Sequence, residues 1–184
     1  MARGFTGEDC ARRRRVLHET LAAFDRCEPR DRYHRAAAAN LSRWRAASSL
    51  SPVSAEVTVT RGDWGEVAGA VTRQFGVCFA VLNMANAHVP GGAYVEGASA
   101  QEANMFRRTD CHFAIDATEY DPLTERYSPE MTMLISGSRG EVYLDTAMPR
   151  VCIRGPEDVI VFAIHAPGYG PDNYLPFKAA FGAA

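Results

Sequence analysis

Residues 77–97 read VCFAVLNMANAHVPGGAYVEG, a run of six apolar residues followed by a segment rich in asparagine and glycine. The run Val77–Leu82 is apolar on both faces and rich in β-forming residues, which is typical of a central strand in a parallel sheet covered on both sides. The segment after it contains adjacent glycines, Gly91 and Gly92, that allow the backbone to turn. Ligands of open α/β sheets bind where such loops leave the strands. This stretch therefore predicts a sheet and, beside it, a ligand site.

The residues on either side of this stretch extend the pattern. Glu56–Thr60 alternates with period two as a strand does, and apolar residues then recur at helical steps from Trp64 to Phe75. Together with Val77–Leu82 this predicts a β-α-β unit. A second helix is expected after the glycines, from about Ala98 to Thr109.

The remaining elements point to a mixed α/β layered domain. Two N-terminal helices are predicted over Ala11–Phe24 and Arg32–Ala47, the second with an apolar stripe formed by Tyr33, Ala37, Leu41 and Trp44. Further strands are expected at Met131–Ile135, Glu141–Leu144, Val151–Ile153 and Val159–Ile164, and a C-terminal helix near Tyr174–Phe181. A polar, proline-bearing linker at residues 48–54 divides the chain into a helical, basic extension at 1–50 and a larger domain at 56–184.

Composition agrees with one compact domain. The chain has 184 residues, of which 47% are apolar and 23% charged, with a formal net charge of −2. Its apolar runs are far shorter than the roughly 18 residues of a membrane span, so we expect no membrane partner. Residues 1–50 hold eleven arginines and six acids. The rest of the chain is acidic and no aromatic residues interleave with Arg12–Arg15, which argues against a nucleic-acid partner.

The five cysteines are scattered, with no paired spacing, and predict neither a disulfide framework nor a metal site. The N-terminus carries charge in place of the apolar core of a signal peptide. We therefore expect a cytoplasmic protein, although secretion by a signal-independent route stays open.

Several side chains near the glycines could carry binding chemistry. Gly91 and Gly92 can turn their N–H groups toward an anion such as a diphosphate, and the amides of Asn83 and Asn86 suit sugar hydroxyls. An ordinary Pro-Gly-Gly turn is the alternative. His88 and His112 flank the segment, but no Ser or Cys with a matching base accompanies them, so a nucleophilic triad is not predicted.

The runs Asn83–Ala93 and Gly97–Thr109 together resemble the signature of microbial-type poly(ADP-ribose) glycohydrolases, a branch of the macrodomain superfamily. That signature is three glycines, a spacer, then Gln-Glu-Glu and a helix with arginine. The resemblance implies a macrodomain-like three-layer α/β/α fold with a mixed central sheet, preceded by N-terminal helices. It also implies that the chain hydrolyses ADP-ribose linkages on modified proteins or polymer, without a cofactor.

The resemblance assigns roles to individual residues. Asp63 matches the aspartate that binds the adenine amine, and it is also placed to cap the helix that begins at Trp64. Asn86 matches the asparagine that reaches the distal ribose. Phe162 is a candidate for stacking on adenine, with a plain core role as the alternative. The remaining matches are Gly91 and Gly92 in the diphosphate loop and Gln101 and Glu102 in Gln-Glu-Glu.

Two positions depart from the family pattern. Ala93 replaces the third glycine, and Ala103 replaces the second glutamate, which is the general acid of the family. Either Glu102 or Glu96 would have to supply the proton instead, or the chain is a non-catalytic reader of ADP-ribose. On this interpretation Ala103→Glu would complete the motif. We also expect a shortened second half, because no convincing second diphosphate loop lies between Cys152 and Val159.

Overall fold

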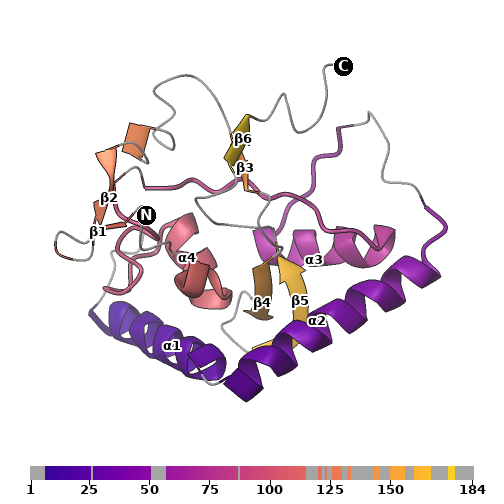
Figure 1. The fold of residues 1–184 in the computed structure, drawn as a ribbon, viewed down its shortest axis with the longest axis horizontal. Helices are drawn as coiled ribbons and strands as arrows, with labels where there is room; N and C mark the ends of the chain where they lie inside the picture. The colour runs from indigo at the N-terminus through magenta and orange to yellow at the C-terminus, as the bar shows by residue number, and fades with distance from the viewer. Residues whose placement is uncertain are drawn as a thin grey trace.

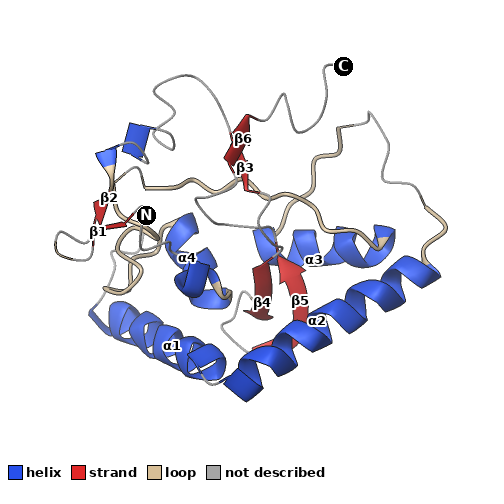
Figure 2. Ribbon diagram, in the orientation of Figure 1, coloured by secondary structure: helices blue, strands red, loops and turns tan. Residues whose placement is uncertain are grey.

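The computed structural model describes residues 7–25, 27–50, 57–86, 88–114, 120–121, 123, 126–129, 132–133, 143–145, 150–155, 160–166 and 174–176. Helices form most of this part of the chain, and the strands are short (Figure 2). None of the described helices has both the length and the apolar character that crossing a bilayer requires.

The two N-terminal helices are present. Helix α1 spans Gly7–Asp25 and α2 spans Cys27–Ala47, so both predictions are confirmed with slightly wider bounds. On α2, Ala37 is fully buried and Tyr33 packs beside it, as the apolar stripe predicted. Helix α1 packs against α2 at its end and lies along the lower edge of the molecule in Figure 1.

The two helices that flank the apolar run are also confirmed. Helix α3 covers Trp64–Phe75, begins at the cap residue Asp63, and ends at Gly76 in the left-handed conformation with φ 66°. A side chain on Gly76 would collide with the backbone of Arg45 on α2. Helix α4 covers Gln101–Arg108, and a short 3₁₀ turn, η1, follows at Cys111–Ala114.

The described strands form three antiparallel pairs. They are β1 (Tyr120–Asp121) with β2 (Arg126–Tyr127), β3 (Tyr143–Asp145) with β6 (Tyr174–Pro176), and β4 (Arg150–Arg154) with β5 (Ile160–Ala166). Three of the predicted strands overlap β3, β4 and β5 and are confirmed there. The described residues contain no parallel pair, so the mixed central sheet remains a prediction.

Two predicted strands are wrong. Residues 57–60 and 77–82 belong to no strand, and the β-α-β unit is therefore absent from the described residues. Val57 and Val59 are almost fully exposed, and none of the described strands covers them. The carbonyl of Leu82 accepts a hydrogen bond from the side chain of Gln101 instead of from a ladder partner. An apolar sequence is compatible with a strand, but a strand also needs backbone hydrogen bonds to a neighbouring strand.

The C-terminal predictions need correction as well. Residues 174–176 form a strand where a helix was expected, because Pro176 disfavours helical geometry in the preceding Leu175, and Pro176 pairs opposite Tyr143. Within the strand expected at residues 131–135, Thr132 and Met133 are helical. Thr132 N–H donates to the carbonyl of Ser128 at 2.9 Å, which is a helical spacing. The other residues of these two predictions lie outside the described part.

The core has two main clusters that share helix α1. One gathers Phe24 of α1, Ala37 of α2 and the β4 residues Val151 and Ile153. The other joins Leu17 of α1 to Tyr94 of the glycine segment, Ala103 and Phe106 of α4, and Cys111 of η1. Helix α1 thus packs on both β4 and the predicted ligand loop.

Buried polar contacts reinforce this attachment of α1. Thr20 Oγ1 donates to the carbonyl of Arg107 at 2.7 Å and accepts from Arg154 Nε at 2.6 Å. The same guanidinium of Arg154 donates to Glu19 at 2.9 Å. One α1 residue therefore holds both α4 and β4. A domain boundary near residue 50 stays a prediction.

Candidate functional site

The glycine segment forms a tight turn. Gly91 and Gly92 have φ values of 72° and 58°, both in the left-handed region that favours glycine. The turn is closed by Gly92 N–H, which donates to the carbonyl of Val89 at 2.9 Å. A Cβ on Gly91 would lie 2.5 Å from Cδ1 of Tyr94, whereas a Cβ on Gly92 would have nothing nearer than 3.7 Å. Gly91 is thus required by packing, whereas a Cβ on Gly92 would make only ordinary van der Waals contacts with Asn86 and Glu102.

Asn86 shapes the start of this turn. Its Oδ1 accepts hydrogen bonds from the backbone N–H groups of His88 and Val89, both at 2.9 Å. This side chain therefore acts locally as a turn former, which is a common role of asparagine. A contact with a distal ribose stays a prediction for Asn86.

Glu102 lies at the centre of the site. Its side chain comes from the first turn of α4 and the residue is only 2% exposed. Oε2 accepts the backbone N–H of Asn86 at 2.7 Å, and Oε1 lies 3.4 Å from Nδ2 of Asn83. A Cβ on Gly92 would sit 3.7 Å from Oε2. The glycine turn, both asparagines and one buried carboxylate therefore converge.

Asn83 leaves one polar atom of this cluster unsatisfied. Its Oδ1 is buried and has no hydrogen-bond partner among the described residues. Most buried polar atoms in proteins do have a partner. The amide oxygen can accept a hydrogen bond from a donor such as a hydroxyl group.

Gln101 holds the segment that leads into the site. Its Oε1 accepts Met84 N–H at 2.9 Å, and its Nε2 donates to the carbonyl of Leu82 at 2.8 Å. The side-chain amide thus pairs with the backbone much as a neighbouring strand would. This contact fixes residues 82–84 beside α4, just before Asn83 and Asn86 enter the cluster.

Ala103 faces away from Glu102. It is 1% exposed and packs in the apolar cluster with Leu17, Tyr94 and Phe106. Successive helix residues point in directions about 100° apart, which separates the two neighbours. A glutamate at position 103 in this arrangement would extend into apolar surroundings.

Three other predicted residues lie at the margin or outside this cluster. Ala93 has an exposed side chain, and its carbonyl accepts the N–H groups of Glu96 and Ala98 at 3.2 and 3.1 Å. Glu96 is exposed, beyond the next turn. Phe162 belongs to β5, and its side chain lies outside the described part. An adenine contact of Phe162 stays a prediction.

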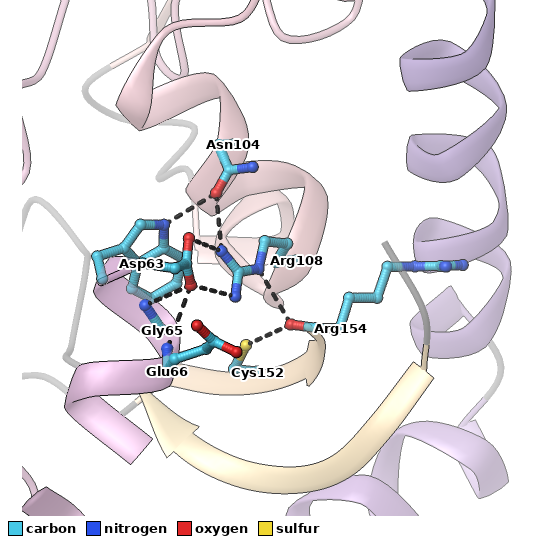
Figure 3. A network of polar contacts seen from close by, with 8 residues as sticks. Asp63, Gly65, Glu66, Asn104, Arg108, Cys152 and Arg154 are labelled. Carbon is cyan, nitrogen blue, oxygen red and sulfur yellow. Dashed lines mark hydrogen bonds and ion pairs between the residues drawn. The ribbon is translucent and has the colours of Figure 1, made fainter. Parts of the chain in front are cut away.

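Asp63 caps α3 and is engaged by an arginine (Figure 3). Its Oδ1 accepts the backbone N–H groups of Gly65 and Glu66 at 2.9 and 3.2 Å. Both carboxylate oxygens also accept from Arg108, each at 2.8 Å. The capping role is confirmed, and an adenine contact stays a prediction.

The surroundings of Asp63 also set its protonation. Burial by itself would raise the pKa of Asp63, but the Arg108 guanidinium and the two backbone N–H donors outweigh burial and hold the pKa below its ordinary value. Asp63 is therefore a firmly ionised partner of Arg108.

Sequence reasoning missed Arg108 and the residues around it. Arg108 is 1% exposed, its Nε donates to the carbonyl of Arg154 at 3.0 Å, and its guanidinium lies 4.6 Å from the ring centre of Trp64. Asn104 Oδ1 accepts from both Arg108 and Trp64, at 3.1 and 2.8 Å. In the sequence, Arg107 and Arg108 look like ordinary basic residues at the end of a helix. The available signal was their position on α4, a short helix in which nearly every residue is buried.

A second missed contact lies under the glycine turn. The hydroxyl of Tyr94 is 2.6 Å from Nδ1 of His112, and the Tyr94 ring packs 4.7 Å from the ring of Phe106, centre to centre. Because Gly91 packs against the Tyr94 ring, the Tyr94–His112 pair supports the glycine turn.

Among the described residues, no three His, Cys, Asp or Glu side chains form a group that could hold a metal ion.

Comparison with protein families supplies a clear assignment. A family model described as "Microbial-type PARG, catalytic domain" matches residues 13–132, which is more than half of the chain and includes most of α1, all of α2, α3 and α4, and the glycine turn. Comparison with curated proteins and with solved structures gave no match. The chain therefore belongs to the family of microbial-type PARG catalytic domains.

Proposed function

We propose that this chain binds ADP-ribose in the cluster of Asn83, Asn86, Gly92 and Glu102 and hydrolyses its glycosidic linkage with Glu102 as the acid. Family membership implies a glycohydrolase with a macrodomain-like fold and suggests poly(ADP-ribose) as substrate. The proposal includes the three-layer α/β/α arrangement of that fold.

The observation that carries the proposal is the convergence on Glu102. The Glu102 carboxylate is 2% exposed beside a left-handed glycine turn, and burying a carboxylate requires compensating hydrogen bonds. The N–H of Asn86 and the amide of Asn83 are two of its partners. A ligand seated on the glycine turn at Gly92 would lie next to this carboxylate.

The chemistry fits glycoside cleavage. Breaking the bond at the anomeric carbon of ribose passes through an oxocarbenium-like state, in which the departing oxygen must receive a proton and a water must be positioned. A carboxylic acid at Glu102 would supply the proton, and the buried Oδ1 of Asn83 would accept a ribose hydroxyl. Gly91 and Gly92 would approach the diphosphate with their backbone.

A non-catalytic reader is the second candidate, and Ala103 favours it. By the resemblance, the acid of the family belongs at position 103, where alanine has no proton to give. Such a chain would bind ADP-ribose through the same cluster and release none. The two candidates therefore predict the same binding and different turnover.

Calorimetry with free ADP-ribose tests the binding that both candidates share. Wild-type protein should bind, and Asn83→Ala should bind about two- to tenfold more weakly, because a neutral hydrogen bond contributes about 0.5–1.5 kcal/mol. Asn40→Ala is the matched control, because the Asn40 side chain accepts from Arg43 within α2, outside the proposed cluster, and this variant should bind like the wild type. Absence of heat from folded wild-type protein at millimolar ADP-ribose would overturn the proposal.

A further inference from the structure

The side chain of Tyr94 contacts both the glycine turn and α4, the helix that carries Glu102. Tyr94 is 5% exposed and follows Gly91 by three positions. A Cβ on Gly91 would lie 2.5 Å from Cδ1 and 2.8 Å from Cε1 of the Tyr94 ring, so the turn packs directly on this ring. On α4, the ring of Phe106 lies 4.7 Å from the Tyr94 ring, centre to centre. The Tyr94 ring therefore contributes to the spacing between the turn and α4.

The same spacing sets the geometry of the proposed ligand cluster. Gly92 follows Gly91 directly, and a Cβ on Gly92 would lie 3.7 Å from Oε2 of Glu102. Glu102 and Phe106 are four residues apart and so lie about one turn apart along α4. Because both belong to one helix, a shift of the Tyr94 ring against Phe106 would also move the turn relative to the carboxylate of Glu102.

A hydrogen bond holds the far end of the Tyr94 ring. The hydroxyl of Tyr94 lies 2.6 Å from Nδ1 of His112, which belongs to the 3₁₀ turn η1. The His112 ring in turn packs edge-on against Phe113, 5.2 Å away between ring centres, and Phe113 packs against the core cluster of Phe24. The hydroxyl thus ties the ring under the glycine turn to η1 and, through Phe113, to the second core cluster.

We propose that Tyr94 and His112 are a positioning pair, whose hydrogen bond fixes the glycine turn at the separation from Glu102 that ADP-ribose binding requires. Both residues act through the turn and not through contact with the ligand. This inference rests on the proposed function, because it assumes that ADP-ribose occupies the cluster of Gly92 and Glu102. It applies equally to the hydrolase and to the reader, since both bind the ligand in that cluster.

The test uses variants of the full chain that remove the hydrogen bond from either side. Tyr94→Phe keeps the ring and loses the hydroxyl, His112→Leu removes its partner, and Y94F/H112L lacks both groups. His112→Asn is the conservative variant, because the asparagine amide can place a polar atom near the position of Nδ1. Tyr33→Phe removes a hydroxyl from the other main core cluster and is the matched control.

Calorimetry with free ADP-ribose is carried out at a temperature at which thermal melts show every variant to be folded. Tyr94→Phe and His112→Leu should each weaken binding by about two- to tenfold, the range that a neutral hydrogen bond covers. Y94F/H112L should bind about as weakly as the weaker single variant, because both substitutions remove the same bond. His112→Asn should recover most of the affinity that His112→Leu loses, and Tyr33→Phe should bind like the wild type.

Three outcomes would overturn this inference while leaving the proposed function in place. The first is a Tyr94→Phe protein that melts at a lower temperature but binds ADP-ribose as tightly as the wild type, which would make the pair structural only. The second is a pair of single-variant losses that multiply in Y94F/H112L, and the third is a His112→Asn protein that binds as weakly as His112→Leu. Failure of wild-type protein to bind ADP-ribose would instead overturn the proposed function itself.

Discussion

Arg108 and Asp63 form a two-pronged ion pair, with both N–O distances at 2.8 Å, that joins the end of α4 to the start of α3. The Arg108 side chain is almost fully buried, and Trp64, Asn104 and the carbonyl of Arg154 complete its surroundings. The pair therefore fixes the helix that carries Glu102 relative to the helix that precedes the apolar run.

Asp63→Asn should destabilise the fold. It leaves a buried guanidinium without its anionic partner, and a hydrogen bond to a charged group contributes about 1.5–3 kcal/mol. Arg108→Lys should cost a similar amount because a lysine cannot form the two-pronged contact. Urea denaturation measures both, with the exposed Arg43→Lys as control. A wild-type free energy of unfolding in Asp63→Asn would contradict this account of the pair.

Protonation of the Asp63 carboxylate should lower the free energy of unfolding at acid pH. The folded-state pKa of Asp63 is lowered, while an unfolded aspartate titrates near about 3.9. The unfolded chain then takes up a proton first, so the contribution of Asp63 is present above about pH 4 and is lost as the pH falls toward the folded-state pKa. Urea midpoints should drop less steeply below about pH 4 for Asp63→Asn. If the urea midpoints of the variant and the wild type fell in parallel below about pH 4, Asp63 would not be the source of the acid sensitivity.

Substitutions at the two glycines of the turn should separate folding from binding. Gly91→Ala places a methyl group 2.5 Å from Tyr94 and 2.9 Å from Phe106 in a left-handed backbone, so we expect a loss of about 2–4 kcal/mol in stability. Gly92→Ala has room for its methyl group, so only the backbone strain of about 1–2 kcal/mol remains. That methyl group borders Glu102, and ADP-ribose affinity should fall although the protein folds.

Thermal melting of Gly91→Ala and Gly92→Ala measures the loss of stability, and calorimetry with ADP-ribose measures the loss of affinity. A Gly92→Ala protein that binds ADP-ribose as tightly as the wild type would show that the ligand does not pass Gly92.

Ala103→Glu should damage the fold more than it helps catalysis. Position 103 is 1% exposed among Leu17, Tyr94 and Phe106, and a carboxylate there should cost about 4 kcal/mol or more. Ala100→Glu is the matched control, because position 100 is exposed and precedes α4, where an acidic side chain is favourable. A stable Ala103→Glu protein with at least about a hundredfold faster release of ADP-ribose would instead put the acid at position 103.

The helices could be predicted from the sequence because their signals are local. The stripe through Ala37, the Asp63 cap and the Gly76 end of α3 all depend on residues within a few positions of one another. The two segments expected as strands, residues 57–60 and 77–82, could not be predicted in the same way. Val77–Leu82 has the composition of a strand, but its observed partner is the side chain of Gln101, which follows it by about twenty positions.

The candidate site was predictable in part, because its sequence signals are also local. The sequence named Asn83, Gly92 and Glu102 as a group, and the structure brings them together. It could not tell that Glu102 and Ala103 would face opposite surroundings, because this depends on how α4 packs against α1. Nor could it distinguish the buried Arg108 from an ordinary basic residue at a helix end.

The rate of ADP-ribose release from poly(ADP-ribose) by wild-type protein and by Glu102→Gln tests the central claim most directly. Loss of a positioned acid should lower the rate by about 10²- to 10⁴-fold, with a much smaller change in ADP-ribose affinity, while Glu66→Gln on the exposed side of α3 should act like the wild type. A wild-type protein that binds ADP-ribose but releases none, or a Glu102→Gln variant that keeps the wild-type rate, would contradict the assignment of Glu102 as the acid.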